Sequence, residues 1–358
     1  MMLAAALAGL ALTPSAVPPG LYDGTIGSLP VRLCMAERHG AYYYRSRLVP
    51  IMLSPVEGSS GLFSEGNGSE PSLSLRGAVG EAVIGEWRSG SRRLPVRLRS
   101  ISFDKGEFED DPCASKTFQA PRLEGVRIVR SEVVQAGQRV TLTTLDTRGH
   151  FPDFSIVSLQ LPGAGSAVAQ INRRLFEPFR DSEEADWKGC DRGGYWGGGT
   201  GASYDVELTL TLATRRWLAV MERGGGFCEG AHPDEWSNPL LFDRRSGAEV
   251  ELLDWLSTRA VTKERLGEGE DRFYRTLTPA FRAVLMKRYR HDDECTEAVA
   301  DTEGWSAELR RTGIVFLPSM PHVMQACEEE VLLPWASLGP WLSGEGRSEV
   351  AALKAEWR

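Results

Sequence analysis

Six cysteines, spread over the whole chain, constrain its fold more than any other feature of the sequence. They fall two by two, as Cys34 and Cys113, Cys190 and Cys228, and Cys295 and Cys327. Many connectivities are open to six cysteines, but this distribution favours three local disulfides, 34–113, 190–228 and 295–327. Six buried thiols are the alternative, because a free cysteine packs like a small apolar residue. An even count without a Cys-x-x-Cys pair is typical of an exported, oxidised protein and disfavours zinc ribbons and thioredoxin-type chemistry.

Residues 1–18 predict an export signal. An apolar run from Met1 to Leu12 has about the length of a secretory h-region and is too short to span a bilayer. The positive residues that usually precede such a run are missing, so a frayed apolar tail is the alternative. No other segment is apolar enough to form a transmembrane segment. Together with the cysteines, this segment predicts a periplasmic or secreted protein.

The composition is that of a globular protein rather than a disordered or membrane-embedded one. The chain has 358 residues, of which 42% are hydrophobic and 25% charged, and this length suits two domains. Its 41 basic and 49 acidic residues give a net charge of -8. No nucleic-acid partner is expected, because such a surface needs clustered positive charge. A cationic protein partner stays open, because an acidic surface speeds its encounter with a basic one.

Residues 19–115 predict an all-β domain. Short runs of alternating apolar and polar residues are separated by clusters of Gly, Pro and Ser. The run Pro30-Val31-Arg32-Leu33 recurs as Pro95-Val96-Arg97-Leu98. Similar hairpins in succession indicate an antiparallel meander that could roll into a small barrel. Residues 115–125 are then expected to form a linker.

Residues 120–345 predict an α+β domain with an antiparallel sheet and a few helices. Helical spacing relates Val168, Ile171, Leu175, Phe176 and Phe179. Thr278-Pro279 predicts a helix start, with Thr as the cap and Pro at the first helical position. A final helix is expected at 346–358. Strands are expected at 125–129, 140–145, 154–161, 204–212, 217–221 and 314–317.

The stretch from Gly226 to Asn238 carries most of the candidate binding residues. It combines Cys228, a Gly-Ala-His-Pro turn and an aromatic side chain, and it precedes a strand–turn–strand pattern around 243–247. We expect His232, Trp236 and Asn238 to contact a partner. Catalysis by His232 would need a nucleophile or carboxylate within hydrogen-bond reach. Acidic neighbours in a turn are weak evidence for this, and a purely structural role for His232 is the alternative.

The segment 188–201 is rich in glycine and predicts a flexible surface loop. A phosphate cradle would need such a loop before a helix, whereas this one leads into a strand. Tyr195 and Trp196, near Trp187, could form an exposed aromatic patch that contacts sugar or protein. The alternative is that these aromatic side chains fold back onto the sheet.

No residue is assigned a catalytic, cofactor-binding or metal-binding role. The sequence has no Gly-x-Ser-x-Gly elbow and no His-Glu-x-x-His pair. Paired carboxylates for glycoside hydrolysis stay open, because their spacing is spatial rather than sequential.

Residues 120–340 resemble the extracytoplasmic domain of the lysozyme-binding anti-sigma factor family of Gram-positive bacteria, a region also found beside a peptidoglycan deacetylase. The similar elements are Ile171-Asn172, the hairpin from Tyr204 to Met221, Gly230-Ala231-His232-Pro233, the run from Leu241 to Asp254, and Pro334-Trp335. The resemblance implies an α+β fold, an envelope location and binding of lysozyme or peptidoglycan. Sigma-factor control and deacetylase chemistry belong to other segments of those proteins and are not expected here.

The sequence therefore predicts an exported, non-catalytic binding protein of the cell envelope, with a lysozyme-like protein or peptidoglycan as its partner. One alternative is a wall-acting hydrolase whose site combines the loop 228–238 with carboxylates of the C-terminal half. Another is a structural envelope protein that docks through its N-terminal β-domain.

Overall fold

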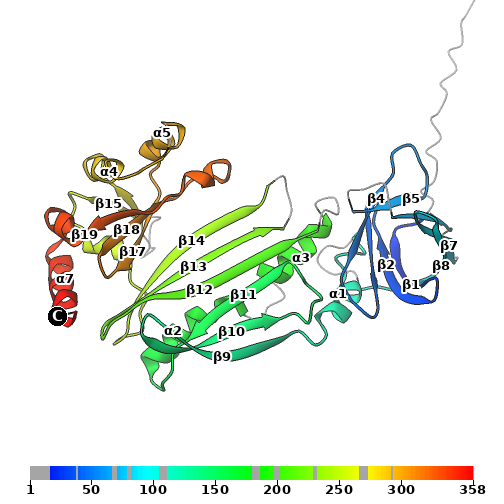
Figure 1. Ribbon diagram of the computed structural model, residues 1–358, viewed down its shortest axis with the longest axis horizontal. Helices are drawn as coiled ribbons and strands as arrows, with labels where there is room; N and C mark the ends of the chain where they lie inside the picture. The colour runs from blue at the N-terminus through cyan, green and yellow to red at the C-terminus, as the bar shows by residue number, and fades with distance from the viewer. Residues whose placement is uncertain are drawn as a thin grey trace, which may run out of the picture.

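The chain forms a barrel, a long open sheet and a C-terminal group of small elements. The computed structural model describes residues 17–37, 39–66, 71–78, 82–104, 111–179, 186–196, 201–228, 232–265, 273–291 and 293–357. The barrel and the C-terminal group lie at opposite ends of the open sheet (Figure 1). The predicted α+β fold with an N-terminal β meander is confirmed. Residues 1–16 of the predicted export signal lie outside the described residues. Among the described residues, no helix has the length and apolar character needed to cross a membrane.

Eight antiparallel strands close into the barrel. Each strand pairs with the next, and β1 also pairs with β8, so the meander has no free edge. Its interior is filled by apolar side chains such as Leu33, Leu73 and Leu98. The strands are β1 (Gly20–Ile26), β2 (Leu29–Met35), β3 (Gly40–Tyr44), β4 (Ile51–Pro55), β5 (Leu62–Glu65), β6 (Ser72–Arg76), β7 (Val83–Ser89) and β8 (Arg92–Ile101).

The outer face of β1–β3 carries a second apolar cluster, which α1 (Lys116–Leu123) covers. Ser115 caps this helix by accepting a hydrogen bond from Phe118 N (3.2 Å), and the Phe118 ring lies 4.9 Å from that of Tyr43. The expectation of a linker at 115–125 is therefore wrong for most of that segment. Pro121 and a mixed polar sequence conceal the helix, whose residues Phe118, Gln119 and Arg122 are buried.

The open sheet has six strands in the order β14-β13-β12-β11-β10-β9. Every neighbouring pair is antiparallel except β11 and β12, which are parallel. A parallel pair needs a crossover, which α2 (Ser166–Leu175), the 3-10 turn η1 (Glu177–Phe179) and α3 (Asp186–Trp196) provide. The strands are β9 (Arg127–Gln135), β10 (Gln138–Asp146), β11 (Phe154–Gln160), β12 (Ser203–Ala213), β13 (Trp217–Phe227) and β14 (Asp234–Asp243).

Two expectations about this sheet are wrong. The Gly-rich segment forms the helix α3 through Trp196, rather than a loop, and residues 197–200 lie outside the described residues. Each glycine in a helix costs roughly 1 kcal/mol, but burial of Trp187 and the bond from Cys190 to Cys228 offset this cost. The strand expected after the turn 243–247 is reduced to one bridge between Phe242 and Glu249, because the chain then enters η2 (Leu252–Trp255).

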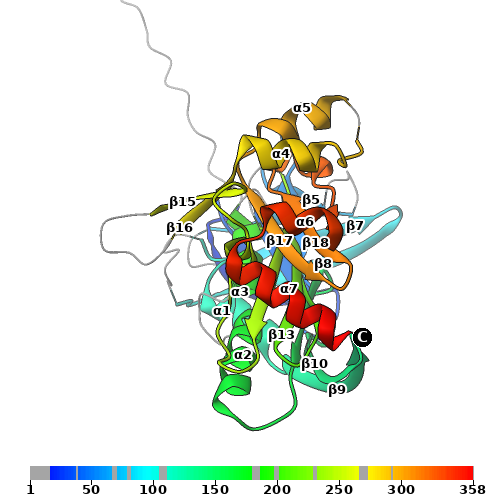
Figure 2. The same ribbon diagram turned by 90° about the vertical axis from the view of Figure 1, so that its left-hand side faces the viewer.

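The C-terminal group packs on the far end of the sheet, and the hairpin β15–β16 projects from it (Figure 2). Thr278 caps α4 as predicted, accepting a hydrogen bond from Phe281 N at 3.3 Å. The predicted strand at 314–317 is the buried β18. The elements are β15 (Val261–Arg265), β16 (Phe273–Leu277), α4 (Pro279–Met286), α5 (Asp293–Asp301), β17 (Trp305–Arg310), β18 (Gly313–Pro318), η3 (His322–Cys327), β19 (Val331–Pro334), α6 (Trp335–Leu338), η4 (Gly339–Trp341) and α7 (Gly344–Glu356).

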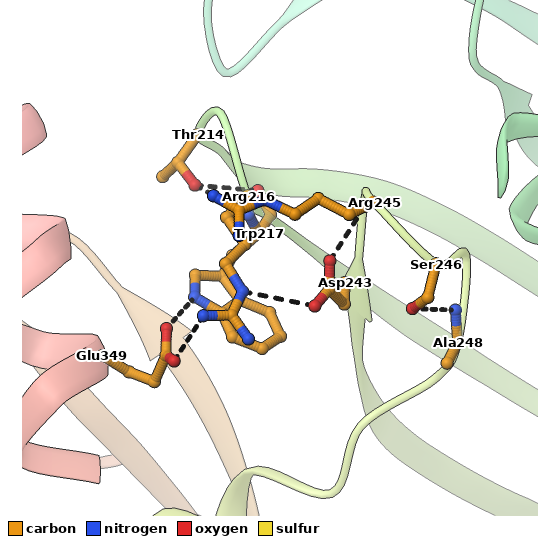
Figure 3. A network of polar contacts seen from close by, with 8 residues as sticks. All are labelled: Thr214, Arg216, Trp217, Asp243, Arg245, Ser246, Ala248 and Glu349. Atoms are coloured by element: carbon orange, nitrogen blue, oxygen red, sulfur yellow. Dashed lines mark hydrogen bonds and ion pairs between the residues drawn. The ribbon is translucent and has the colours of Figure 1, made fainter. Parts of the chain in front are cut away.

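A polar network fastens the final helix to the sheet (Figure 3). Glu349 of α7 accepts hydrogen bonds from Arg216 and from Trp217 Nε1, the latter at 3.2 Å. Arg216 Nε also donates to Asp243 Oδ2 (3.2 Å), and its guanidinium lies 4.7 Å from the centre of the Trp217 ring. The network thus joins the β12–β13 hairpin, the end of β14 and α7.

Three disulfides join the cysteines in the pairs predicted: Cys34–Cys113, Cys190–Cys228 and Cys295–Cys327. The first ties β2 to the segment before α1, the second ties α3 to the end of β13, and the third ties α5 to η3. Three disulfides indicate a protein that folds in an oxidising compartment outside the cytoplasm.

Candidate binding site at the barrel–sheet junction

A buried arginine holds the barrel, α1 and α3 together. The side chain of Arg122 is 1% exposed and forms a two-pronged ion pair with Asp191 of α3, at 2.7 and 2.9 Å. It also donates to Gln119 Oε1 (2.5 Å) and to the Leu48 carbonyl of the barrel (3.3 Å). Two-pronged pairing fixes the orientation of both side chains, so Arg122 determines how α3 sits against the barrel.

The loop between β10 and β11 completes this junction. The guanidinium of Arg122 lies 4.3 Å from the centre of the Phe151 ring. The neighbouring His150 places its Nδ1 at 2.8 Å from the Arg122 carbonyl. Phe151 in turn packs edge-on against Trp187 of α3, with ring centres 5.6 Å apart. These rings form an apolar surface beside the buried ion pair.

A cavity of about 290 Å³, which we call the junction pocket, opens between α1 and α3. Its wall is mainly apolar and includes Ala120, Leu123, Phe151 and Trp187. A neighbouring cavity of about 450 Å³ shares Leu123, Trp187 and Lys188 with it. Concave apolar sites with a few convergent polar groups are the usual form of ligand pockets, so the junction pocket is the main candidate site.

Three cationic side chains belong to the described wall of this site. Lys116, Lys188 and Arg192 line the junction pocket. Its one carboxylate among the described lining residues is Asp191, whose charge is balanced by the ion pair with Arg122. The described wall of the junction pocket thus combines an apolar surface with cationic groups.

The structure places Tyr195 and Trp196 at the end of α3. It describes the backbone of these two residues and not their side chains. Trp187, which could have joined them in an exposed patch, is instead 5% exposed and belongs to the core of the sheet. The Cys190–Cys228 disulfide joins this helix to the end of β13, where the stretch 226–238 begins. Residues 229–231 of the predicted turn lie outside the described residues.

His232, Trp236 and Asn238 lie at and along the start of β14. His232 is exposed. Trp236 is half-buried, with its ring centre 5.9 Å from that of Tyr204. It also lies across Gly224, where a Cβ atom would approach the indole to 2.2 Å. Asn238 is exposed and donates a hydrogen bond to Glu222 Oε2 (3.4 Å).

Several acidic groups lie at the start of β14. Gln325 of η3 donates to the Glu235 carbonyl, and its amide lies 3.4 Å from Asp234 Oδ1. Burial raises the pKa of the nearby Glu328 carboxyl, and the negative charges of Glu235 and Asp234 raise it further. The hydrogen bond from Met320 N (2.7 Å) opposes this rise without cancelling it. We call Asp234, Glu235 and Glu328 the acidic end of β14.

The predicted candidates are therefore divided between a cationic junction and an acidic strand end. Sequence reasoning missed the residues that build the junction: Arg122, Phe151 and Asp191. Nothing local distinguishes them, since Arg122 follows a proline in an expected linker and Asp191 lies in an expected loop. Cys190 was the one local signal for this junction, because its predicted disulfide with Cys228 anchors the glycine-rich segment to the sheet.

One group of described residues has the side-chain types of a metal site. Atoms of His39, Asp111 and Cys113 lie within 4.8 Å of one another. The sulfur of Cys113 is bonded to Cys34, however, so it cannot supply the thiolate that a metal would need. His39 Nε2 and Asp111 Oδ2 are 3.2 Å apart and buried, and they secure the chain beside the disulfide.

The chain matches no protein-family model and no curated protein significantly. Solved structures show similarity at low sequence identity. A member of the DUF3298 family from Bacteroides fragilis has 13% identity and a TM-score of 0.37, over 64% of this chain and 96% of that one. A DUF3298 family protein from Pseudomonas aeruginosa has 14% identity and a TM-score of 0.36, over 62% of this chain and 97% of that one.

Proposed function

We propose that this protein is an exported binding protein of the cell envelope and that its ligand enters the junction pocket. The observation that carries the proposal is the combination of an apolar wall with three cationic side chains, Lys116, Lys188 and Arg192. A ligand that buries a small apolar group and carries a nearby anion fits both features.

Peptidoglycan supplies this chemistry. Its stem peptides combine methyl side chains with free carboxylates, so a methyl group can enter the apolar wall while a carboxylate meets Lys116, Lys188 or Arg192. The cavity volume of about 290 Å³ suits a short segment rather than a whole repeating unit. We therefore propose stem-peptide carboxylates as the recognised groups.

The test is a calorimetric titration of the oxidised protein with soluble wall fragments, in low and moderate salt. Parallel samples would contain the same fragments with their carboxylates amidated. We expect salt-sensitive binding of the unmodified fragments only. Lys188→Glu should weaken it by about tenfold or more, since a charge contact of 1.4 kcal/mol corresponds to tenfold in affinity. Lys354→Glu, on the exposed face of α7, is the matched control and should leave binding unchanged. Absence of binding to the carboxylate form would contradict the proposal.

The same samples address the hydrolase alternative. Glu328, with its raised pKa and two carboxylates nearby, is the residue that such an activity would use as a general acid. Chromatography of the fragments after incubation should show no new products. Products that disappear in Glu328→Gln would instead make the protein an enzyme.

A second candidate function is binding of a lysozyme-like cationic protein at the acidic end of β14, with His232, Trp236 and Asn238 as contacts. The specific observation is that two exposed carboxylates, Asp234 and Glu235, lie close enough to Glu328 to raise its pKa further, beyond the larger rise that burial causes. A cationic partner would favour the ionised carboxyl, so binding would release a proton. Affinity should therefore fall as the pH drops through the pKa of Glu328. Titration of lysozyme at several pH values, with Glu328→Gln and Asp234→Asn, measures this dependence.

A further inference from the structure

We propose that two copies of this chain associate through the edge strand β9, so that their six-stranded sheets join into one. Among the residues that the structure describes, β9 is the last strand of its sheet and pairs with β10 alone. It is nine residues long and contains no proline. Its pairing with β10 is regular from Arg127 to Gln135, without a bulge. Proteins usually protect long edges by such devices, so an uninterrupted edge suits a partner strand.

The hairpin turn determines which backbone groups of β9 face outward. Ala136 and Gly137 form a two-residue turn with φ of 47° and 74°, the left-handed values of a type I′ turn. Such a turn closes on a hydrogen-bonded pair, here Gln135 with Gln138. Because the pattern alternates along an antiparallel pair, Gln135, Val133, Ser131, Val129 and Arg127 bond to β10. The N–H and C=O groups of Ile128, Arg130, Glu132 and Val134 then face away from the sheet.

A second β9 can pair with these outward groups in an antiparallel, two-fold arrangement centred on Ser131. This register pairs the whole length of the strand with itself. It sets Arg130 opposite Glu132 of the partner subunit and, by symmetry, Glu132 opposite the partner's Arg130. Both side chains are exposed in the single chain. Opposite charges directly across an antiparallel pair stabilise it.

The neighbouring two-fold registers are unfavourable. Centring the pair on Arg130 would place two guanidinium groups opposite each other, and centring it on Glu132 would do the same with two carboxylates. Like charges in directly opposed positions destabilise strand pairing. The sequence of β9 is therefore complementary to itself in the one register that also uses all of its outward groups.

Apolar side chains reinforce this register. Val134 is 69% exposed and Val129 is 37% exposed, both high for aliphatic residues on a strand. Pairing about Ser131 places Val129 opposite the partner's Val133 and Ile128 opposite the partner's Val134. Each of these contacts occurs twice in the dimer, so association covers apolar surface that one chain leaves in water.

Charge reversal on β9 tests the proposal, with sedimentation velocity of the oxidised full chain as the readout. We expect a concentration-dependent dimer for the natural sequence. Arg130→Glu and Glu132→Arg should each weaken it by at least about tenfold, because each creates two like-charge pairs. The double variant R130E/E132R restores opposite charges and should recover the dimer. Arg97→Glu reverses an exposed charge on a closed barrel strand and should leave the dimer intact.

Hydrogen exchange supplies a second readout that does not depend on substitution. The outward amides of Arg130 and Glu132 should become protected as the protein concentration rises, whereas those of Val129 and Ser131 should be protected at every concentration. A protein that stays monomeric up to its solubility limit would overturn the proposal. So would a dimer that Arg130→Glu leaves unchanged, or one in which the double variant fails to recover.

Discussion

The barrel and the six-stranded sheet are built from similar antiparallel hairpins, yet they differ in how their edges end. In the barrel, β1 meets β8, and every strand has two neighbours. In the open sheet, β14 and β9 each pair with one strand within the described part of the chain. Elements of the C-terminal group pack beside β14, including η3, whose Gln325 reaches Glu235. The comparison identifies one place where recognition can occur, because the edge of an open sheet presents unpaired backbone groups.

The two regions also differ in how they obtain a core. The barrel encloses one apolar cluster made of its own strands and Val17. The open sheet needs α2 and α3 on one cluster and the C-terminal group on another. Its stability therefore depends on contacts distant in sequence, whereas the barrel depends mainly on neighbouring strands. Substitutions at the contacts between regions should have larger effects than those within either one.

The largest effect is expected at the buried ion pair between the two regions. Asp191→Ala leaves the Arg122 guanidinium buried without its counter-charge, which costs about 3–5 kcal/mol. Urea unfolding followed by circular dichroism measures this loss. Asp146→Ala is the matched control, because its ion pair with Arg127 lies in solvent and should matter little. Equal effects of the two substitutions would mean that Arg122 is not the connection between barrel and sheet.

The attachment of the C-terminal group should be the next most sensitive. Glu349→Ala removes hydrogen bonds from Arg216 and Trp217 and should lower the free energy of unfolding by about 1.5–3 kcal/mol. Glu356→Ala, on the same helix, removes one exposed bond to Arg215 N and should have a smaller effect. Thermal unfolding of both variants ranks them, and the reverse order would contradict the role of the network in Figure 3.

Within the barrel, the close approach of neighbouring strands can be tested at one glycine. A Cβ atom at Gly85 would lie 1.9 Å from the Ser74 carbonyl oxygen, so β6 and β7 would have to separate. Gly85→Ala should destabilise by about 1–3 kcal/mol, the usual range for overpacking. Gly344→Ala, at the first position of α7 with nothing within 4 Å, should be neutral or slightly stabilising. A neutral Gly85→Ala would show that the barrel tolerates expansion better than a closed sheet should.

The sequence predicted the elements whose signals are local. Alternation marked the barrel strands, Thr278 marked its helix, and the order of the cysteines indicated their pairing. It did not predict α1 and α3, because the contacts that stabilise them join residues far apart in the chain, such as Arg122 with Asp191 and Phe118 with Tyr43. The junction pocket lies between these two helices, so it could not be predicted either. His232, Trp236 and Asn238 stay predictions as partner contacts.

The smallest expected effect tests the helix that the sequence concealed. Gly189 lies in α3 with nothing within 4 Å of its Cβ position, so Gly189→Ala should stabilise the protein by about 0.5–1 kcal/mol. Gly194, in the same helix, is the matched control. Its Cβ would approach the backbone of Gly201 to 2.8 Å, so Gly194→Ala should destabilise. Chemical unfolding measures both variants, and changes of opposite sign in the free energy of unfolding would support a helix that packs against the sheet. Destabilisation by Gly189→Ala would instead favour the loop that the glycine content predicts. It would then contradict α3 as a wall of the junction pocket.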